Sequence, residues 1–470
     1  MQLLQRVPSA LFLLVVGLIS HGDTSAKATT PAQVPTRSKV LTPAAAPAPV
    51  GQIFNATPTD YLSKVRALKA GDTLVLAAGT YDDPGDVPGL PVFNLNGTAR
   101  APITITGASN ASQTVLLGRS THNTIRFSGS SYVIVKNLTV DGRDLGGDAV
   151  NAQGVSHHIT VENLIIRGVG SNQQVVGIST NGATTWNWTI RGNTIVGAGT
   201  GMYLGNSDGA NPFVAGLIER NVIRDTIGYN VQIKHQAPWP NITGLPTGKT
   251  NTVVRHNVFT KGSNSSTGAD ARPNLLIGDV PASGPGADNG YEVYGNFFYQ
   301  NPTEALFQAE GNVAFYANLL VSTTGSAVHV QRHNGAVRAI RIFGNTVVAA
   351  GGGISVTGGN APYTQQVVAN AVFAATPISA HNASANFTGT YANAARHLNN
   401  PTATIGQLDL FPKTGGTIRG AAAIDTAGLS AFTDWALDFN GKRRDWSFRG
   451  AYSGEGVNSG WRPKIEIKAK

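Results

Sequence analysis

The chain has 470 residues and no cysteine, which excludes a disulfide framework and any site built on thiolates, such as a zinc-thiolate centre. Its 56 glycines and only 13% charged residues favour many tight turns over many surface helices. The formal net charge of +9 suits an anionic polymer as a partner.

The first 50 residues differ from the rest. A single Arg precedes an apolar run at 11–19, and a small-residue cleavage signal follows at 26–28, so residues 1–28 are predicted to be a secretory signal peptide. The apolar run is too short to span a bilayer. Residues 29–50 are rich in Ala, Pro and Thr and predict a flexible linker. We therefore expect a secreted or periplasmic protein without a membrane partner.

An Asn follows a β-branched strand nine times, at intervals of 22 to 39 residues, and a short apolar run follows each of these Asn residues. A period in this range, built on strands, indicates a solenoid whose stacked coils share one core. Asn tolerates left-handed backbone, and its amide can bond the same amide one coil away, so we predict an Asn ladder. The nine residues are Asn137, Asn163, Asn193, Asn221, Asn257, Asn296, Asn318, Asn345 and Asn370.

A second series of short strands lies between these corners. Together the two series supply about three strands per coil, which predicts an all-β chain folded as a right-handed parallel β-helix. The second series comprises residues 176–180, 201–205, 230–234, 274–278, 305–309, 327–331 and 353–357.

Over about residues 51–460 the chain resembles the exported right-handed β-helix proteins of the pectate-lyase-like superfamily. DYLSKVRALKAGDTLVLAAGTY followed by PITITG is similar to the cap and first coil of alginate- and chondroitin-type lyases, and it implies a short amphipathic capping helix at about 59–68. The stretches IDTAG and DFNGKRRDWSFRGAY resemble the closing segment of such chains. The expected domains are a capped β-helix over 51–400 and a closing segment over 401–470.

The sequence YNVQIKHQ at 229–236 is expected to form the floor of a substrate groove. Strand alternation predicts an outward column through the second series of strands, and extended loops at 236–251, 262–273 and 280–290 predict the groove walls. The predicted column contains Tyr203, Gln232, Leu276, Phe307 and His329, with Lys234 and Gln331 two places further on.

The residues around this column predict the binding of a charged sugar polymer. Aromatic side chains could stack on sugar rings, and polar or charged groups could bind hydroxyls and carboxylates. The predicted substrate-binding residues are Tyr203, Gln232, Trp239, Arg272, Asp279, Phe307, Gln308, Glu310, Gln331 and Arg332.

The basic residues favour eliminative cleavage of a uronate polymer. That reaction needs a cation for the sugar carboxylate, a base for the adjacent carbon-bound proton and an acid for the leaving oxygen. Lys234 is the preferred base, because neighbouring cations and desolvation disfavour its charged form. Some lyases of the superfamily use a Lys and Arg pair, which Lys234 and Arg255 resemble. The predicted catalytic set is Lys234, His235, Arg255, His329 and His333, with Arg272 and Arg332 as further cations.

Three other functions stay open, since this fold alone does not decide function. A glycoside hydrolase would use Asp279 with Glu310 or Glu304 as its carboxylate pair. A uronate epimerase would share the proton abstraction of a lyase. A carbohydrate-binding or surface β-helix would have no catalytic group.

No metal site is predicted, although calcium could bind Asp279 and Glu310 if more oxygen ligands converged there. Asp141, Asp144 and Asp148 are expected to bond backbone groups in Gly-rich corners. The expected partner is an acidic polysaccharide bound by a monomer. Scattered cations and the absence of a recognition motif exclude nucleic acid.

Overall fold

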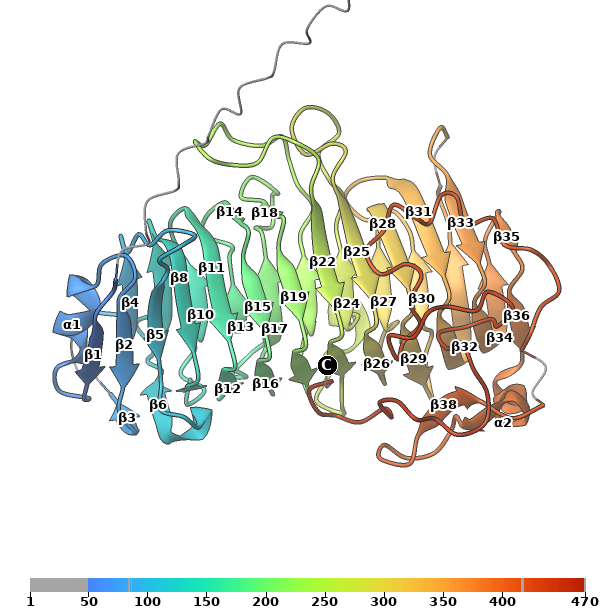
Figure 1. Ribbon diagram of the computed structural model, residues 1–470, viewed down its shortest axis with the longest axis horizontal. Coiled ribbons are helices and arrows are strands. Elements are labelled where there is room, and N and C mark those ends of the chain that lie inside the picture. Colours follow the sequence, from blue (N-terminus) through green and yellow to red (C-terminus); the bar gives the residue numbers. More distant parts are fainter. Residues whose placement is uncertain (1–49, 83–84, 86, 360, 416–417, 469–470) are drawn as a thin grey trace, which may run out of the picture. The chain divides into compact units, whose positions relative to one another are not determined.

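The computed structural model describes residues 50–82, 85, 87–359, 361–415 and 418–468. The predicted signal peptide and nearly all of the predicted linker lie outside the described residues. The described residues form one compact unit, in which short parallel strands stack coil upon coil (Figure 1).

Each coil contributes one strand to each of three parallel stacks, here named sheets A, B and C. The strands of sheet A are β1 (Ile53–Ala56), β2 (Thr73–Leu76), β5 (Ile103–Thr106), β8 (Ser131–Lys136), β11 (Ser156–Glu162), β15 (Thr189–Arg191), β19 (Leu217–Glu219), β22 (Asn251–Arg255), β25 (Gly290–Tyr294), β28 (Gly311–Tyr316), β31 (Val337–Phe343), β33 (Gln365–Val368) and β35 (Ala383–Ser384), with β14 (Thr185–Trp186) and β18 (Phe213–Val214) beside them.

Sheet B follows sheet A in each coil, and the long strands β32 and β34 continue from sheet B into sheet C. The strands of sheet B are β3 (Gly79–Tyr81), β6 (Thr114–Leu117), β9 (Thr139–Asp141), β12 (Ile165–Arg167), β16 (Thr194–Val196), β20 (Val222–Arg224), β23 (Val258–Thr260), β26 (Phe297–Tyr299), β29 (Leu319–Ser322), β32 (Thr346–Val356), β34 (Ala371–Ser379) and β36 (Phe387–Gly389).

Sheet C completes the coil before the chain returns to sheet A. Its strands are β4 (Leu90–Phe93), β7 (Ile125–Ser128), β10 (Val150–Ala152), β13 (Val176–Ser179), β17 (Thr200–Leu204), β21 (Val231–Ile233), β24 (Leu275–Ile277), β27 (Phe307–Ala309) and β30 (Val328–Val330), followed by the second halves of β32 and β34. Parallel strands joined by crossovers are right-handed in nearly all proteins, and the predicted right-handed parallel β-helix is confirmed.

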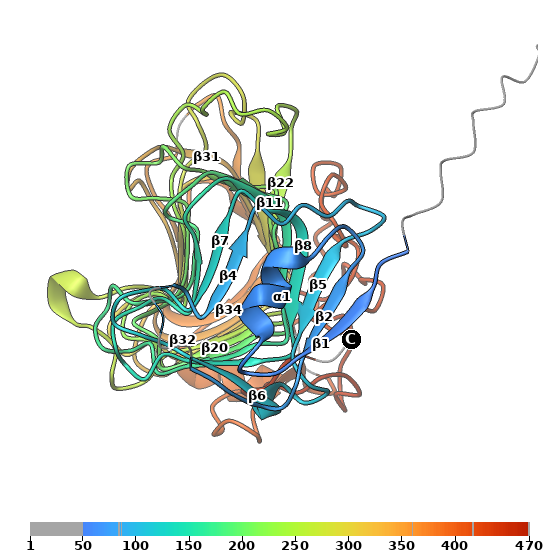
Figure 2. The ribbon, with the colours of Figure 1, turned by 90° about the vertical axis from the view of Figure 1, so that its left-hand side faces the viewer.

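Helices occur mainly at the ends of the solenoid. Helix α1 (Tyr61–Ala67) lies across the open first coil, where Tyr61 and Val65 enter the core (Figure 2). This agrees with the capping helix expected at about 59–68. The other helical turns are η1 (Ala111–Gln113), η2 (Gly268–Asp270), η3 (Tyr391–Asn393) and α2 (Ala394–His397), and a small antiparallel pair, β37 (Leu398–Asn400) and β38 (Asp409–Pro412), follows α2.

The predicted Asn ladder lies at the corner between sheets A and B. Each amide donates to the Oδ1 of the Asn one coil further on, as in Asn221 Nδ2 to Asn257 Oδ1 at 2.9 Å and Asn257 Nδ2 to Asn296 Oδ1 at 3.0 Å. The second donor hydrogen of Asn257 reaches the carbonyl of Ile218 at 2.9 Å. The ladder runs through Asn193, Asn221, Asn257, Asn296, Asn318, Asn345, Asn370 and Asn386.

Asn137 and Asn163 do not belong to this buried ladder, contrary to the sequence prediction. They have left-handed backbone, with φ of 58° and 52°, and occupy the position before the ladder, while Leu138 and Leu164 fill the inward place. In the later coils the residue before the Asn is left-handed instead, for example His256 with φ of 58°. The sequence pattern therefore identifies the corner in these two coils, but the Asn lies one residue before the buried ladder position.

The chain after residue 400 returns along the outside of sheets A and B. Phe439, Phe448 and Tyr452 belong to one apolar cluster with outward residues of sheet B such as Phe297. On sheet A, Leu429 and the half-buried Phe432 cover a stack of outward aromatic rings. In that stack Tyr294, Tyr316 and Phe343 lie 4.8 and 4.6 Å apart between neighbouring ring centroids. Sheet C is therefore the face that this segment leaves open.

Candidate active site

The outward column of sheet C is a row of mainly polar side chains, interrupted by Leu276. Neighbouring strands align Tyr203 with Gln232, and Gln232 with Leu276. The row continues from Leu276 to Gln308 and then to His329. Tyr203, Gln232, Leu276 and His329 therefore occupy the predicted column.

Phe307 does not face outward, and this prediction is wrong. Phe307 aligns with the inward Leu275, is fully buried and stacks on Phe315 with ring centroids 4.3 Å apart. Gln308 takes the outward place. The shift arises because Leu306 is also buried at the corner before the strand, so the apolar run does not reveal where alternation begins.

A hollow of about 400 Å³ lies over the N-terminal part of this column. Its floor comes from strands β17 and β21, and the connection that contains η2 adds one wall, which projects from the solenoid at the left of Figure 2. The hollow is lined by Gln173, Gln174, Val176, Asn181, Thr200, Tyr203, Ser207, Tyr229, Gln232, Lys234 and Arg272.

Lys234 extends into this hollow directly after β21. Its Nζ lies 5.9 Å from the centroid of the Tyr203 ring, and among the described residues no hydrogen bond or ion pair involves this Nζ. Gly205, on the preceding coil, leaves room for the side chain, because a Cβ there would lie 3.2 Å from the Lys234 Cβ. Burial lowers the pKa of Lys234 from its ordinary 10.5, and the charge of Glu310 opposes this shift.

Tyr229 and Arg272 form the opposite side of the hollow. The Arg272 Cζ lies 5.8 Å from the centroid of the Tyr229 ring. The guanidinium is held by the carbonyls of Ala269 and Ala271 at 2.8 and 2.9 Å. It also approaches the exposed carboxylate of Asp270 at 3.4 Å. Burial raises the pKa of Tyr229, and it also raises that of Tyr203, so both phenols stay protonated over the physiological range.

Lys261 supports this wall from beneath. It is nearly inaccessible, and its Nζ donates to the carbonyl of Arg272 at 2.9 Å. Burial, aided by the charge of Arg272, lowers the pKa of Lys261 to about 7. Lys261 therefore positions the η2 connection and does not itself reach the hollow.

The remaining basic candidates lie further along sheet C or beside it. His329 is half-buried in the outward column. Gln331 follows β30 at the position that Lys234 has after β21. The side chains of Arg332 and His333 are exposed. His235 is half-buried next to Lys234 but does not line the hollow. Burial and the charge of Lys234 lower its pKa.

Asp279 and Glu310 are structural and not open to a substrate. Asp279 is buried and pairs through both oxygens with Arg338, at 3.1 Å each. Glu310 is buried as well and accepts the backbone N–H groups of His333, Asn334 and Gly335 at 2.8 to 2.9 Å. The expectation that Asp279 and Glu310 bind substrate is therefore corrected, because their oxygens already fix the turn after β30.

Arg255 and Trp239 lie away from the hollow. Arg255 is on β22 of sheet A, where its Nη2 pairs with the Glu219 carboxylate at 2.8 Å and its Nη1 donates to Tyr294 at 2.9 Å. The predicted pairing with Lys234 is therefore wrong. Trp239 packs beside Trp186 in a separate apolar cluster and donates to Gln236 Oε1 at 2.8 Å.

The described residues contain no group of three or more His, Cys, Asp or Glu side chains close enough to hold a metal ion. The oxygens of Asp279 and Glu310 are held by Arg338 and backbone N–H groups, so they do not fit calcium. Asp141, Asp144 and Asp148 bond backbone N–H groups at 2.8 to 3.1 Å, as predicted for Gly-rich corners.

The predicted site residues leave out seven of the eleven residues that line the hollow: Gln173, Gln174, Val176, Asn181, Thr200, Ser207 and Tyr229. Tyr229 had a signal, because it opens the stretch at 229–236 directly before the buried Asn230. Val176 and Thr200 are the first residues of β13 and β17, and the remaining four lie in the connections beside these strands, where no sequence motif marks them.

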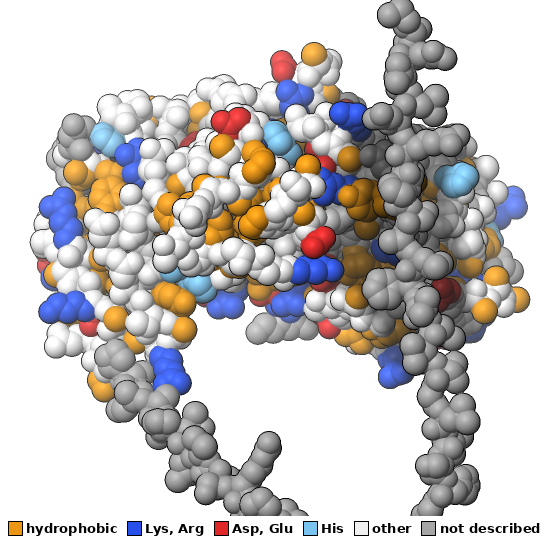
Figure 3. Space-filling model, turned by 90° about the horizontal axis from the view of Figure 1, so that it is seen from above, with side chains coloured by type: hydrophobic (Ala, Val, Ile, Leu, Met, Phe, Trp, Pro, Cys, Tyr) orange, Lys and Arg blue, Asp and Glu red, His pale blue; other side chains and the backbone are white. Residues whose placement is uncertain are grey.

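The long connections 234–250 and 278–289, which join sheet C to sheet A, rise at the top of Figure 1. Seen from this side, Lys and Arg side chains are spread singly over the surface and acidic side chains are fewer (Figure 3). No described helix is long and apolar enough to cross a membrane.

No protein-family model matches the chain, and no curated protein matches it. Several solved structures are similar. An alginate lyase from Paenibacillus sp. str. FPU-7 is 17% identical, with a TM-score of 0.45, over 70% of this chain and 99% of that one. A GH136 lacto-N-biosidase from Eubacterium ramulus is 12% identical, with a TM-score of 0.45, over 72% of this chain and 68% of that one.

The pectate lyase Pel9A is 12% identical, with a TM-score of 0.44, over 86% of this chain and 96% of that one. Identities this low concern the fold alone. The assignment of the fold rests on the strand order and the parallel register of sheets A, B and C. The chain is a right-handed parallel β-helix protein.

Proposed function

We propose that this protein is a polysaccharide lyase that cleaves an acidic, uronate-containing glycan by β-elimination. The observation that carries the proposal is Lys234. Its ammonium group lies in an open hollow on sheet C without a hydrogen-bond or ion-pair partner among the described residues, and burial lowers its pKa. A desolvated lysine with a lowered pKa is suited to act as a general base.

In the proposed reaction the neutral amine of Lys234, made accessible by the lowered pKa, takes the proton from the carbon next to the uronate carboxylate. The electrons of that C–H bond form a carbon–carbon double bond, and the bond to the glycosidic oxygen breaks. Tyr203, one coil away and protonated, donates its proton to the leaving oxygen. Each proton is accounted for, since Lys234 gains one and Tyr203 loses one before solvent resets both.

Arg272 is suited to bind the uronate carboxylate. Its guanidinium faces the same hollow as Lys234, and a cation beside the carboxylate makes the neighbouring C–H more acidic. Gln232, outward on β21 between Tyr203 and Leu276, adds a neutral amide for sugar hydroxyls. His329 and Gln331 extend the same column on later coils, which are spaced by about 4.8 Å as adjacent strands are, and are placed to contact further sugars of the polymer.

The two carboxylates of a glycoside hydrolase are less well supported, because Asp279 and Glu310 are buried and bonded. An epimerase would use the same base as a lyase and is separated from it only by its product.

Ultraviolet absorbance of an unsaturated uronate tests the proposal on alginate, pectate, chondroitin and hyaluronate. We expect growth of this absorbance with at least one polymer and none with Lys234→Ala. New reducing ends without absorbance would indicate a hydrolase. A changed uronate configuration in an intact chain, detected by NMR, would indicate an epimerase.

A further inference from the structure

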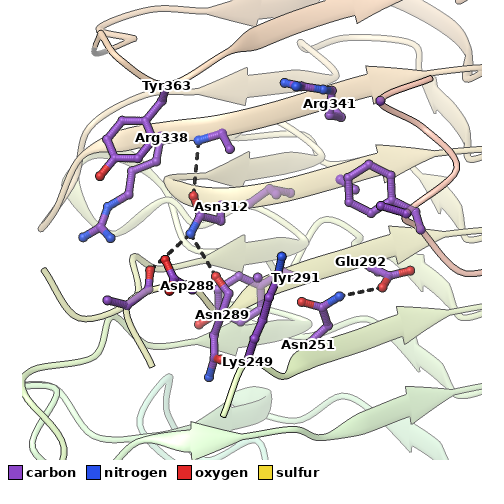
Figure 4. Close-up of a pocket in the computed structure, with 18 of the residues that line it drawn as sticks. Lys249, Asn251, Asp288, Asn289, Tyr291, Glu292, Asn312, Arg338, Arg341 and Tyr363 are labelled. Carbon is purple, nitrogen blue, oxygen red and sulfur yellow. Dashed lines mark hydrogen bonds between the residues drawn. The ribbon is translucent and has the colours of Figure 1, made fainter. Parts of the chain in front are cut away.

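A second hollow, of about 690 Å³, lies on sheet A, away from the sheet that carries Lys234 (Figure 4). Strands β22, β25, β28 and β31 form its floor. These four strands span three coil steps, which is about 14 Å at the usual strand spacing. The returning chain at 428–432 lies on one side, and Tyr363 lies on the other.

Three small residues deepen the floor of this hollow. Gly290, Ala314 and Ala339 lie where the neighbouring outward positions carry large side chains. Two aromatic residues, the exposed Tyr363 and the half-buried Phe432, border the hollow. A flat ring can therefore reach the sheet between them.

Arg341 presents an unused hydrogen-bonding edge to this hollow. Its Nη1 donates to the carbonyls of Ile340 at 3.2 Å and Thr364 at 2.8 Å, which fixes the guanidinium. Among the described residues, neither Nε nor Nη2 has a hydrogen bond or an ion pair. Gly428 lies next to both atoms, and a Cβ added there would be in van der Waals contact with them, at 3.8 Å from Nε and 4.0 Å from Nη2. The edge stays uncovered because Gly428 has no side chain.

The other arginines on the described strands of sheet A are all paired. Arg191 pairs with Glu162 at 3.1 Å, Arg255 with Glu219 at 2.8 Å and Arg338 with Asp279 at 3.1 Å. Arg341 is the exception. The nearest carboxylate in its row is that of Glu292, which lies two strands away, beyond Ala314. An arginine anchored on one side and open along its Nε and Nη2 edge has the geometry that binds a carboxylate through two hydrogen bonds.

Glu292 is occupied by groups that hold the hollow together. It accepts hydrogen bonds from Asn251 Nδ2 at 2.8 Å, Tyr316 at 2.9 Å and the backbone N–H of Thr433 at 2.8 Å. These contacts tie the returning chain to the floor and orient the Asn251 amide (Figure 4). The Asn251 oxygen is left to accept from a ligand hydroxyl.

We propose that this hollow is an accessory binding site for a uronate residue of an acidic glycan. The carboxylate pairs with the Nε and Nη2 edge of Arg341, a hydroxyl donates to Asn251, and the ring packs against Phe432 or Tyr363. The choice of glycan rests on the proposed function. The site holds the polymer without chemistry, since its other acids and bases are either paired or at its exposed rim.

The test measures binding of a short acidic oligosaccharide by isothermal titration calorimetry in the Lys234→Ala background, which does not cleave it. The probes are alginate and pectate tetrasaccharides, with a neutral tetrasaccharide for comparison. We expect two binding events for an acidic probe, and Arg341→Gln should weaken one of them about 10-fold. Arg191→Gln, on the same sheet with the same change of charge, should leave both events unchanged.

Ala431→Glu provides a second variant at an exposed position of the rim. Its carboxylate would compete for Arg341, so it should also remove one binding event while the fold is unaffected. Unchanged binding in Arg341→Gln and Ala431→Glu would overturn the accessory site, as would equal affinity for the neutral probe. Binding that depends on Arg341, in a protein whose parent cleaves none of the polymers, would support this site and reject the proposed lyase.

Discussion

At the scale of single residues, the surroundings of a basic group decide whether it can react. Lys234, Lys261 and Lys468 all have lowered pKa values because they are removed from water. Lys261 and Lys468 donate to backbone carbonyls and are inaccessible, whereas Lys234 opens into a hollow. Burial alone would not distinguish them, but the missing partner does.

Lys234→Ala should abolish turnover and leave binding of the glycan largely intact. Lys234→Arg should not restore turnover, because Arg stays protonated at any working pH and cannot act as a base. The rate of the parent should rise with pH as Lys234 loses its proton, with a midpoint below 10.5, since the pKa of Lys234 is lowered. Initial rates across pH measure this.

His235→Ala is the matched control, since His235 is the neighbouring base but does not line the hollow. It should keep the alkaline limb of the profile. Near-normal turnover of Lys234→Arg, or loss of the alkaline limb in His235→Ala, would reject Lys234 as the base.

At the scale of elements, the ladder corner shows how a repeated side chain replaces a longer turn. Asn257 accepts the backbone N–H of Asn221 and donates to the carbonyl of Ile218, both on the preceding coil, and it also accepts from the Asn221 amide. One side chain therefore satisfies buried polar groups that the corner would otherwise leave unpaired. This lets sheet A continue into sheet B without a loop, while the longer connections around sheet C are free to form walls.

Asn257→Ala should lower the free energy of unfolding by about 3 kcal/mol or more, because each buried polar group left unpaired costs about 1–3 kcal/mol. Asn257 is fully buried, and the substitution leaves the Asn221 amide and the Ile218 carbonyl without the hydrogen bonds that Asn257 makes to them. Urea denaturation measures the change. Asn163→Gly is the control, since Asn163 is exposed and has left-handed backbone that Gly adopts easily. Equal free energies of unfolding for the two variants would show that the buried ladder does not contribute to stability.

At the scale of the whole molecule, the returning chain after residue 400 decides which faces of the solenoid stay open. It covers the outward aromatic rings of sheets A and B. The Lys468 Nζ donates to the carbonyls of Phe439 at 2.8 Å and Gly295 at 3.3 Å, which connects the last residues to the central coils.

Stability should rise with pH through Lys468. Burial lowers its pKa to about 7 in the folded chain, against an ordinary 10.5. Between these values the unfolded chain holds a proton that the folded chain has released, so the free energy of unfolding increases with pH across this window. Lys468→Met should flatten the increase, measured by denaturation at several pH values. Lys464→Met, with a half-exposed ion pair to Glu466, should not, and equal slopes in both variants would refute the assignment.

The sequence by itself determined the solenoid, because inward apolar alternation is a local pattern in every coil and the corner Asn recurs in most of them. It also determined that Lys234 and Gln232 face one groove, since alternation is regular within β21. Only the tertiary structure decided the rest. Whether Phe307 or Gln308 faces outward depended on packing at a corner, and the face of Arg255 depended on the sheet that receives β22. The carboxylates of Asp279 and Glu310 are occupied by Arg338 and by backbone N–H groups of the turn after β30. These contacts form only when distant segments stack.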